Sequence, residues 1–182
     1  MNRTARKYVH LRLVSGLAVV VAAVVIGLAV SKGGPEPGGP LPSGQAILVE
    51  YPLPVGATGT WGTVLPKNPT GEPIELESVT PIGVTGSVII VDVVASYPDR
   101  DGSAVGTQNA FPPKGAAVIP VRGSIIPAAG DPYPHLQVLV GVRRDTDQGS
   151  GTIEGLRIRY WSGGKYYERD IPASLSLRDV LP

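Results

Sequence analysis

A long apolar run near the N-terminus constrains this chain more than any other feature of its sequence. Residues 13–30 form an 18-residue segment that contains no charged side chain. As an α-helix this segment would be about 27 Å long, which is close to the ~30 Å thickness of the hydrocarbon core of a bilayer. We therefore predict a single transmembrane helix over residues 13–30, with the lipid bilayer as its partner.

The charges that flank this run predict how it is oriented. No acidic residue occurs before Gly33, and four basic residues precede the run: Arg3, Arg6, Lys7 and Arg12. The positive-inside rule then places residues 1–12 in the cytoplasm and the domain that follows outside. The alternative is a signal peptide cleaved at residues 29–31, although the apolar region of a signal peptide is normally only about 7–15 residues long. We favour an uncleaved anchor and a location in the cell membrane.

Residues 31–45 (SKGGPEPGGPLPSGQ) form a segment of distinct composition. Five of them are glycine and four are proline. A segment of this kind has little apolar surface to bury, so it tends to stay in contact with solvent. We predict a solvated tether between the anchor and the domain that follows.

Residues 46–182 have the pattern of one β-rich domain. The chain contains 24 glycines and 19 prolines, which favour short strands joined by turns. Short apolar runs predict strands at residues 46–50, 58–65, 72–79, 86–96, 116–126, 136–144, 152–161, 165–171 and 174–178. About seven to nine strands at this spacing are typical of an antiparallel β-sandwich.

The side-chain pattern within these runs predicts how the strands are buried. Ile74 and Leu76 alternate with glutamates, which indicates a strand with one face in solvent. Residues 88–94 are apolar on both faces except at Asp92, which suits a central strand. Residues 136, 138, 140 and 142 point to one face and Gln137 to the other, where Leu139 predicts a covered patch.

Residues 161–166 (WSGGKY) predict a β-hairpin with a two-residue turn. Gly163 and Gly164 supply the positive φ angles that a type I′ or II′ turn requires. The register then pairs Trp161 with Tyr166 on one face and Tyr160 with Tyr167 on the other. The first of these faces also carries two opposite-charge pairs, Arg159–Glu168 and Arg157–Asp170, which support this register.

The order of these features resembles a group of bacterial proteins. A basic N-terminus, one apolar span and a Gly/Pro-rich tether precede a hairpin with the sequences GLRIRY at 155–160 and GKYY at 164–167. This layout resembles small membrane-anchored proteins of actinobacteria with immunoglobulin-like domains outside the membrane. The resemblance implies a location and a fold, and it transfers no functional residue.

The residue types present argue against an enzyme. Cysteine is absent and the only histidines are His10 and His135, which excludes thiol chemistry and ordinary zinc sites. His135 lacks the sequence context of a nucleophile elbow. The acid pairs in loops 99–102 and 145–149 are candidates for calcium, but turns explain them without a metal. We predict no catalytic residue, no metal and no cofactor.

Four of the ten aromatic residues lie in the eight-residue stretch 160–167 of the predicted hairpin: Tyr160, Trp161, Tyr166 and Tyr167. Aromatic side chains often anchor interfaces, so this cluster is a candidate contact with a partner. The alternative is that Tyr160 and Tyr167 complete the core, while Trp161 and Tyr166 form a stabilising pair on the surface.

These features together predict a binding protein of the bacterial cell envelope. From Gln45 onward the chain has 14 acidic and 11 basic residues, a net charge of −3, which argues against nucleic acid as a ligand. We predict an anchored extracytoplasmic module that binds another envelope protein or a wall polymer. The alternative is an accessory subunit of a membrane complex, which contacts its partners through small residues of the span.

Overall fold

The computed structural model describes residues 34–101, 104–146 and 150–178. These residues form a mainly β structure with three sheets. The predicted transmembrane helix at 13–30, and with it residues 1–12, lies outside the described residues. Within the described ranges, none of the helical segments has the length and hydropathy needed to cross a bilayer.

Sheet A and sheet B together contain the last four strands of the described chain. Sheet A has the order β1 (Glu36–Pro37), β12 (Lys165–Ile171), β11 (Gly155–Ser162), β4 (Ile74–Ile82) and β8 (Ile125–Ile126). Sheet B has the order β10 (Gly151–Ile153), β13 (Ala173–Arg178) and β2 (Ile47–Pro52). The pairs β1–β12 and β13–β2 are parallel, whereas the other pairs in these two sheets are antiparallel.

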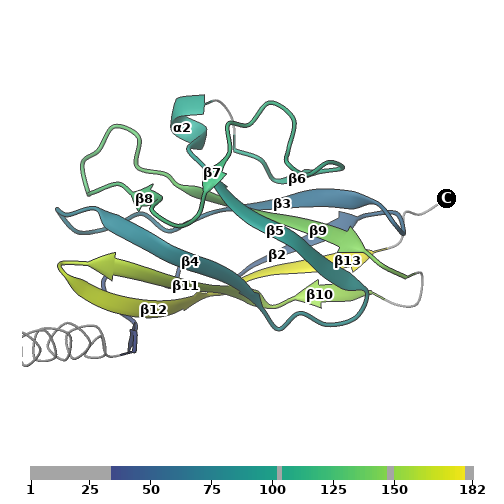
Figure 1. The fold of residues 1–182 in the computed structure, drawn as a ribbon, viewed down its shortest axis with the longest axis horizontal. Coiled ribbons are helices and arrows are strands. Elements are labelled where there is room, and N and C mark those ends of the chain that lie inside the picture. Colours follow the sequence, from purple (N-terminus) through teal and green to yellow (C-terminus); the bar gives the residue numbers. More distant parts are fainter. Residues whose placement is uncertain (1–33, 102–103, 147–149, 179–182) are drawn as a thin grey trace, which may run out of the picture. The chain divides into compact units, whose positions relative to one another are not determined.

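Sheet C is antiparallel and forms a separate layer above β4, β11 and β12 (Figure 1). Its order is β6 (Thr107–Gln108), β3 (Thr58–Val64), β9 (Gln137–Arg144), β5 (Val88–Ser96) and β7 (Ile119–Pro120), and the short helix α2 (Pro98–Asp101) follows β5. The core draws fully buried side chains from all three sheets, among them Trp61, Leu76 and Leu175. The sequence prediction of a mainly β domain is therefore confirmed.

Strand β4 shows how the sequence pattern produces this core. Ile74 and Leu76 have no exposed surface, whereas Glu75 between them is exposed. Because successive side chains of a strand point to opposite faces, one face of β4 packs inward and the other meets solvent. The half-buried strand predicted here is confirmed.

Two of the predicted strands differ in the structure. The run 116–126 forms only the two-residue strands β7 and β8, because residues 121–124 turn sharply between them and Ser124 N–H bonds to the Val121 carbonyl. The run 152–161 is divided at Glu154 into β10 and β11, which belong to different sheets. Strand β5 lies between β9 and β7, as expected of a central strand, but β7 pairs with it only at Val94 and Ala95. A β-bulge between Ile90 and Asp92 leaves Val91 47% exposed.

Strand β9 is buried on both faces, including the face that the sequence predicted to be polar. The amide of Gln137 is 1% exposed because it pairs with the backbone of Val105. Its Oε1 accepts from the Val105 N–H at 3.0 Å, and its Nε2 donates to the Val105 carbonyl at 2.6 Å. Leu139, two residues along on the same face, has no exposed surface, which confirms the covered patch predicted there.

The predicted solvated tether is wrong for residues 35–41, which we name the strap. The compact unit of the chain begins at Pro35. Within the strap, β1 pairs with β12, and the side chain of Leu41 is completely buried. Leu41 is the one large apolar residue between positions 31 and 45, and its burial in the core holds a segment whose composition alone favours solvent.

Candidate binding surfaces

The hairpin of β11 and β12 has the predicted register at every position. Ser162 pairs with Lys165, Trp161 with Tyr166, and Tyr160 with Tyr167, and the pairing continues outward to Leu156 with Ile171. Gly163 and Gly164 have φ angles of +55° and +75°. These left-handed conformations match a type I′ turn, which agrees with the right-handed twist of the strands.

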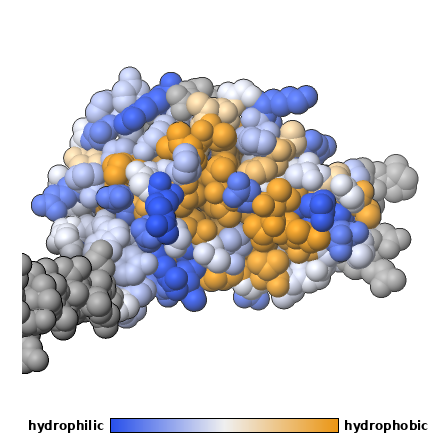
Figure 2. Space-filling view, in the orientation of Figure 1, coloured by the Kyte–Doolittle hydropathy of each residue, from blue (hydrophilic) through white to orange (hydrophobic). Residues whose placement is uncertain are grey.

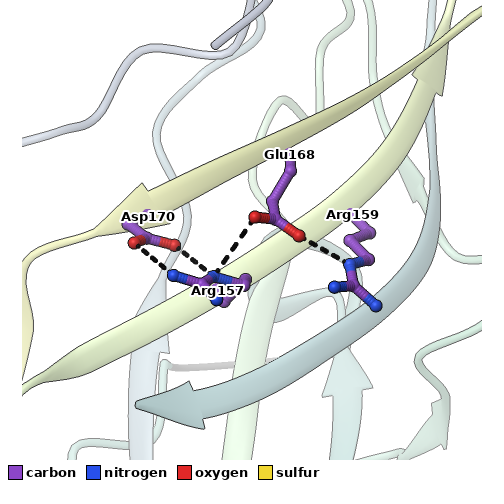
Figure 3. A network of polar contacts seen from close by, with 4 residues as sticks. All are labelled: Arg157, Arg159, Glu168 and Asp170. Atoms are coloured by element: carbon purple, nitrogen blue, oxygen red, sulfur yellow. Dashed lines mark hydrogen bonds and ion pairs between the residues drawn. The ribbon is translucent and has the colours of Figure 1, made fainter. Parts of the chain in front are cut away.

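A ladder of four charged residues covers the outer face of this hairpin (Figure 3). Arg157 Nε lies 2.9 Å from Asp170 Oδ1, and Arg159 Nε lies 2.7 Å from Glu168 Oε2. Arg157 Nε also lies 3.4 Å from Glu168 Oε1, so the two pairs form one network. The hydrogen bond from Arg157 lowers the pKa of Asp170. This pair therefore stabilises the folded state at pH values above the ordinary pKa of a carboxyl group. The stabilisation is lost as the pH falls through the lowered pKa.

The ladder provides a test of the register. Arg159→Glu places two acids opposite each other, so we expect a small loss of stability, and adding Glu168→Arg should restore most of it. Urea unfolding of the four members of this double-mutant cycle measures the coupling. The cycle for Arg159 and Asp170, which belong to different pairs, should give clearly weaker coupling. Equal coupling in the two cycles would contradict the register.

The inner face of the hairpin holds the strap. The hydroxyl of Tyr160 accepts from the Leu41 N–H at 3.1 Å and donates to the Gly38 carbonyl at 2.7 Å. The ring of Tyr167 packs beside it with its centroid 5.6 Å away. Arg169 Nη2 donates to the Gly39 carbonyl at 3.0 Å. Burial raises the pKa of Tyr160, so this hydroxyl stays protonated and keeps donating at neutral pH.

The four predicted contact residues therefore have two different environments. Tyr160 is completely buried, so it cannot contact a partner in this conformation, and Tyr167 is partly buried against the core. Trp161 and Tyr166 lie on the outer face, half-buried, with their rings stacked at 4.8 Å and an interplanar angle of 22°. Glu75 of β4 is the neighbour of Trp161 across the sheet.

A shallow apolar groove lies between β4 and β5, on the face shown in Figure 2. Apolar side chains gather over the middle of this face, and the groove encloses about 660 Å³. Val79, Val93 and Ile119 line it. The salt bridge between Arg122 Nη2 and Glu77 Oε1, at 2.7 Å, lies at its border.

The edge of β5 beside this groove is protected against pairing with another strand. The bulge at Val91 interrupts the regular edge. The carboxylate of Asp92 accepts from the Val93 N–H at 2.7 Å. Bulges and charged residues are the features by which edge strands avoid unwanted pairing. The groove can therefore contact side chains of a partner, but its edge is poorly suited to bind a strand.

The outer edge of strand β2 lacks the features that protect the edge of β5. It lies at the end of sheet B, and its pairing with β13 has no bulge. Ile47 is 51% and Leu48 is 65% exposed, and the preceding Ala46 is also exposed. The first charge along the strand is that of Glu50, which bonds to Arg178. The sequence interpretation treated residues 46–50 as an ordinary strand and missed this edge, because exposure depends on which neighbours the fold supplies.

A search for metal ligands found no candidate site among residues 34–101, 104–146 and 150–178. Within these ranges, no three histidine, aspartate or glutamate side chains come together in a way that could hold a metal. The two loops considered for calcium lie partly outside the described residues. No protein-family model and no curated protein matches this chain.

Proposed function

We propose that this chain is a single-pass membrane protein whose domain lies outside the membrane and acts by binding. The apolar run at 13–30 and the basic residues before it support the anchor and its orientation. The layered sheets and the parallel pairing of β2 with β13 are compatible with an immunoglobulin-like β-sandwich. Intact mass of the native protein tests the anchor, because a chain that begins at Lys32 would reveal a cleaved signal peptide.

The exposed edge of β2 carries the proposal of a binding function. Exposed, flat and apolar edge strands are rare in proteins that act alone, because they pair with other chains. Ile47 and Leu48 are large, exposed and adjacent, and the strand carries no charged residue before Glu50. The partner that fits such an edge is a protein segment that adds a strand to sheet B. We therefore favour an envelope protein over a wall polymer as the ligand.

The hydrogen bonds of β2 indicate which backbone groups would bind this strand. The N–H groups of Ile47 and Leu53 donate to Pro172 and Arg178 carbonyls at 3.1 and 3.3 Å. Backbone groups of alternate residues point to the same side of a strand. The odd positions therefore pair with β13, and the backbone groups of Leu48 and Glu50 point away from it. Pro52 has no N–H, so the available edge is short.

A crosslinking experiment in native membranes tests this proposal. The full-length chain carries a photo-crosslinking side chain at Ala46, and mass spectrometry identifies the adduct. We expect one defined partner protein, and we expect Leu48→Pro to abolish the adduct because it removes an outward N–H. Leu48→Val keeps this N–H and should retain the adduct.

Position Val91, on the protected edge of β5, is the matched control and should not yield the same adduct. Circular dichroism checks that the Leu48→Pro variant is folded. An adduct that persists in a folded Leu48→Pro variant would refute strand addition. An adduct with a second copy of this chain would show that β2 binds the chain itself, and the proposal of an envelope protein as partner would be wrong.

A second candidate function is that of an accessory subunit that contacts its partners through the span. Small residues at six positions of the span favour close packing of helices: Gly16, Ala18, Ala22, Ala23, Gly27 and Ala29. Replacing residues 13–30 by an unrelated apolar span separates the two functions. A binding module should keep the crosslink from position 46, whereas a subunit that assembles through its span should lose its partner.

A further inference from the structure

We propose that the tip of the β11–β12 hairpin, residues 161–166, lies in the headgroup layer of the membrane that anchors the chain. This inference rests on the proposed anchor at 13–30. It assigns a lipid surface as the partner of Trp161 and Tyr166, the two aromatic residues on the outer face of the hairpin.

The direction of the strap supplies the first step. β1 is parallel to β12, with Glu36 beside Tyr167 and Pro37 beside Glu168. Following the chain backward from Glu36 therefore leads along β12 toward its start at Lys165. The start of β12 is also the tip of the hairpin. The chain thus enters the domain from the side on which the tip lies.

The short connection to the anchor supplies the second step. Six residue steps separate Val30 from Glu36, which corresponds to about 20 Å when the chain is fully extended. The tip at Gly164 lies three residues before Tyr167, or about 10 Å along the strand toward the chain's point of entry. The connection can therefore extend at most about 10 Å beyond the tip, which is comparable to the polar layer on each side of a bilayer, about 5–8 Å thick.

The side chains of the tip supply the third step. Trp161 and Tyr166 are half-buried and stacked, so they present one amphipathic aromatic surface. Tryptophan and tyrosine are enriched at both membrane–water interfaces, where their rings lie at the level of the headgroups. Gly163 and Gly164 are exposed and have no side chain that would keep the turn away from the lipid.

The charges around the tip distinguish this contact from attraction to anionic lipid. Lys165 is the only basic residue of the tip. Glu75 is the neighbour of Trp161 on β4, and Glu72 Oε2 lies 3.8 Å from the Cβ position at Gly163. Two acids beside one base do not form a basic patch, so the aromatic rings and not the charges would provide the contact.

Tryptophan fluorescence of the full-length chain in phosphatidylcholine vesicles tests the inference. The chain has two tryptophans, and Trp61 is 1% exposed, so Trp161 is the one that lipid can reach. The Trp161→Phe variant measures the background from Trp61. We expect a lipid spin-labelled near the headgroup to quench most of the Trp161 emission. A lipid labelled near the end of its acyl chain should quench little of it.

Two matched variants identify the cause of the quenching. Inserting about 20 Gly and Ser residues between Ser31 and Gly34 lengthens the connection and should remove most of the quenching. Lys165→Glu should leave the quenching unchanged, and the same result is expected when part of the phosphatidylcholine is replaced by phosphatidylglycerol. Quenching that requires Lys165 and anionic lipid would overturn the proposed aromatic contact.

Flotation of the same vesicles separates this inference from the proposed anchor. A chain that stays with the vesicles after an alkaline wash is anchored, whatever the fluorescence shows. Anchored protein whose Trp161 emission is not quenched from the headgroup layer would overturn the contact and leave the anchor intact. A chain that the wash removes would overturn the anchor and, with it, the inference.

Discussion

Removal of the strap should lower the free energy of unfolding of the domain by about 3–6 kcal/mol. The comparison is between a domain that begins at Pro35 and one that begins at Ala46, which is where the sequence alone predicted the domain to start. The shorter domain loses the completely buried side chain of Leu41. It also loses both hydrogen bonds of the Tyr160 hydroxyl to the strap. Urea unfolding of the two domains measures the difference.

Two substitutions in the longer domain divide this effect into its parts. Leu41→Ala leaves a cavity and should cost about 2–5 kcal/mol. Tyr160→Phe keeps the ring but leaves the Leu41 N–H and the Gly38 carbonyl without this partner, which should cost about 1–3 kcal/mol. If the domains that begin at Pro35 and at Ala46 unfold at the same urea concentration, the strap is not part of the stable fold.

Gly62→Ala should destabilise the domain by about 2–4 kcal/mol, because it forces apart β3 and the loop that covers β9. A Cβ atom at position 62 would clash with the Val105 carbonyl oxygen and would lie 2.8 Å from Gln137 Nε2. The N–H of Gly62 also donates to the Gly106 carbonyl at 2.7 Å. Relief of the clash therefore requires the loop to move, which breaks the hydrogen bonds between Gln137 and Val105.

Gly106→Ala is the matched control, because no atom beyond its two chain neighbours lies within 4 Å of its Cβ position. We expect it to change the free energy of unfolding by less than about 1 kcal/mol. Hydrogen exchange gives a second measurement, because the Val105 N–H bonds to Gln137 and should lose its protection in the Gly62→Ala variant alone. Equal destabilisation by the two substitutions would show that the close contact of Gly62 with Val105 and Gln137 is not the cause of the lost stability.

Local information in the sequence was sufficient for the hairpin and for most long strands. The turn needs two residues with positive φ, and Gly163-Gly164 is the pair that provides them. Once the turn is placed, the pairing of charges and aromatic rings follows from counting outward. Strand β4 was predictable for the same reason, because its apolar and acidic residues alternate with the period of a strand.

Errors in the sequence interpretation occurred where a side chain has a partner far away in the chain. Nothing in the sequence around Gln137 indicates that Val105, 32 positions away, bonds to both ends of its amide. The apolar residues on both faces of β5 suggested a central strand, but how much of its outer edge is covered depends on which strands lie beside it. Among the residues that the structure describes, only the short β7 covers this edge.

The sequence by itself determined the apolar span, the β class of the domain and the register of its C-terminal hairpin, because each depends on residues close together in the chain. The tertiary structure alone decided that the strap belongs to the core and that, among the residues described, β2 forms the edge of sheet B. The bond between Leu41 and Tyr160 joins residues 119 positions apart, and β2 pairs with β13 over a similar separation. The energy of such contacts depends on the folded position of a distant partner, which local periodicity does not encode.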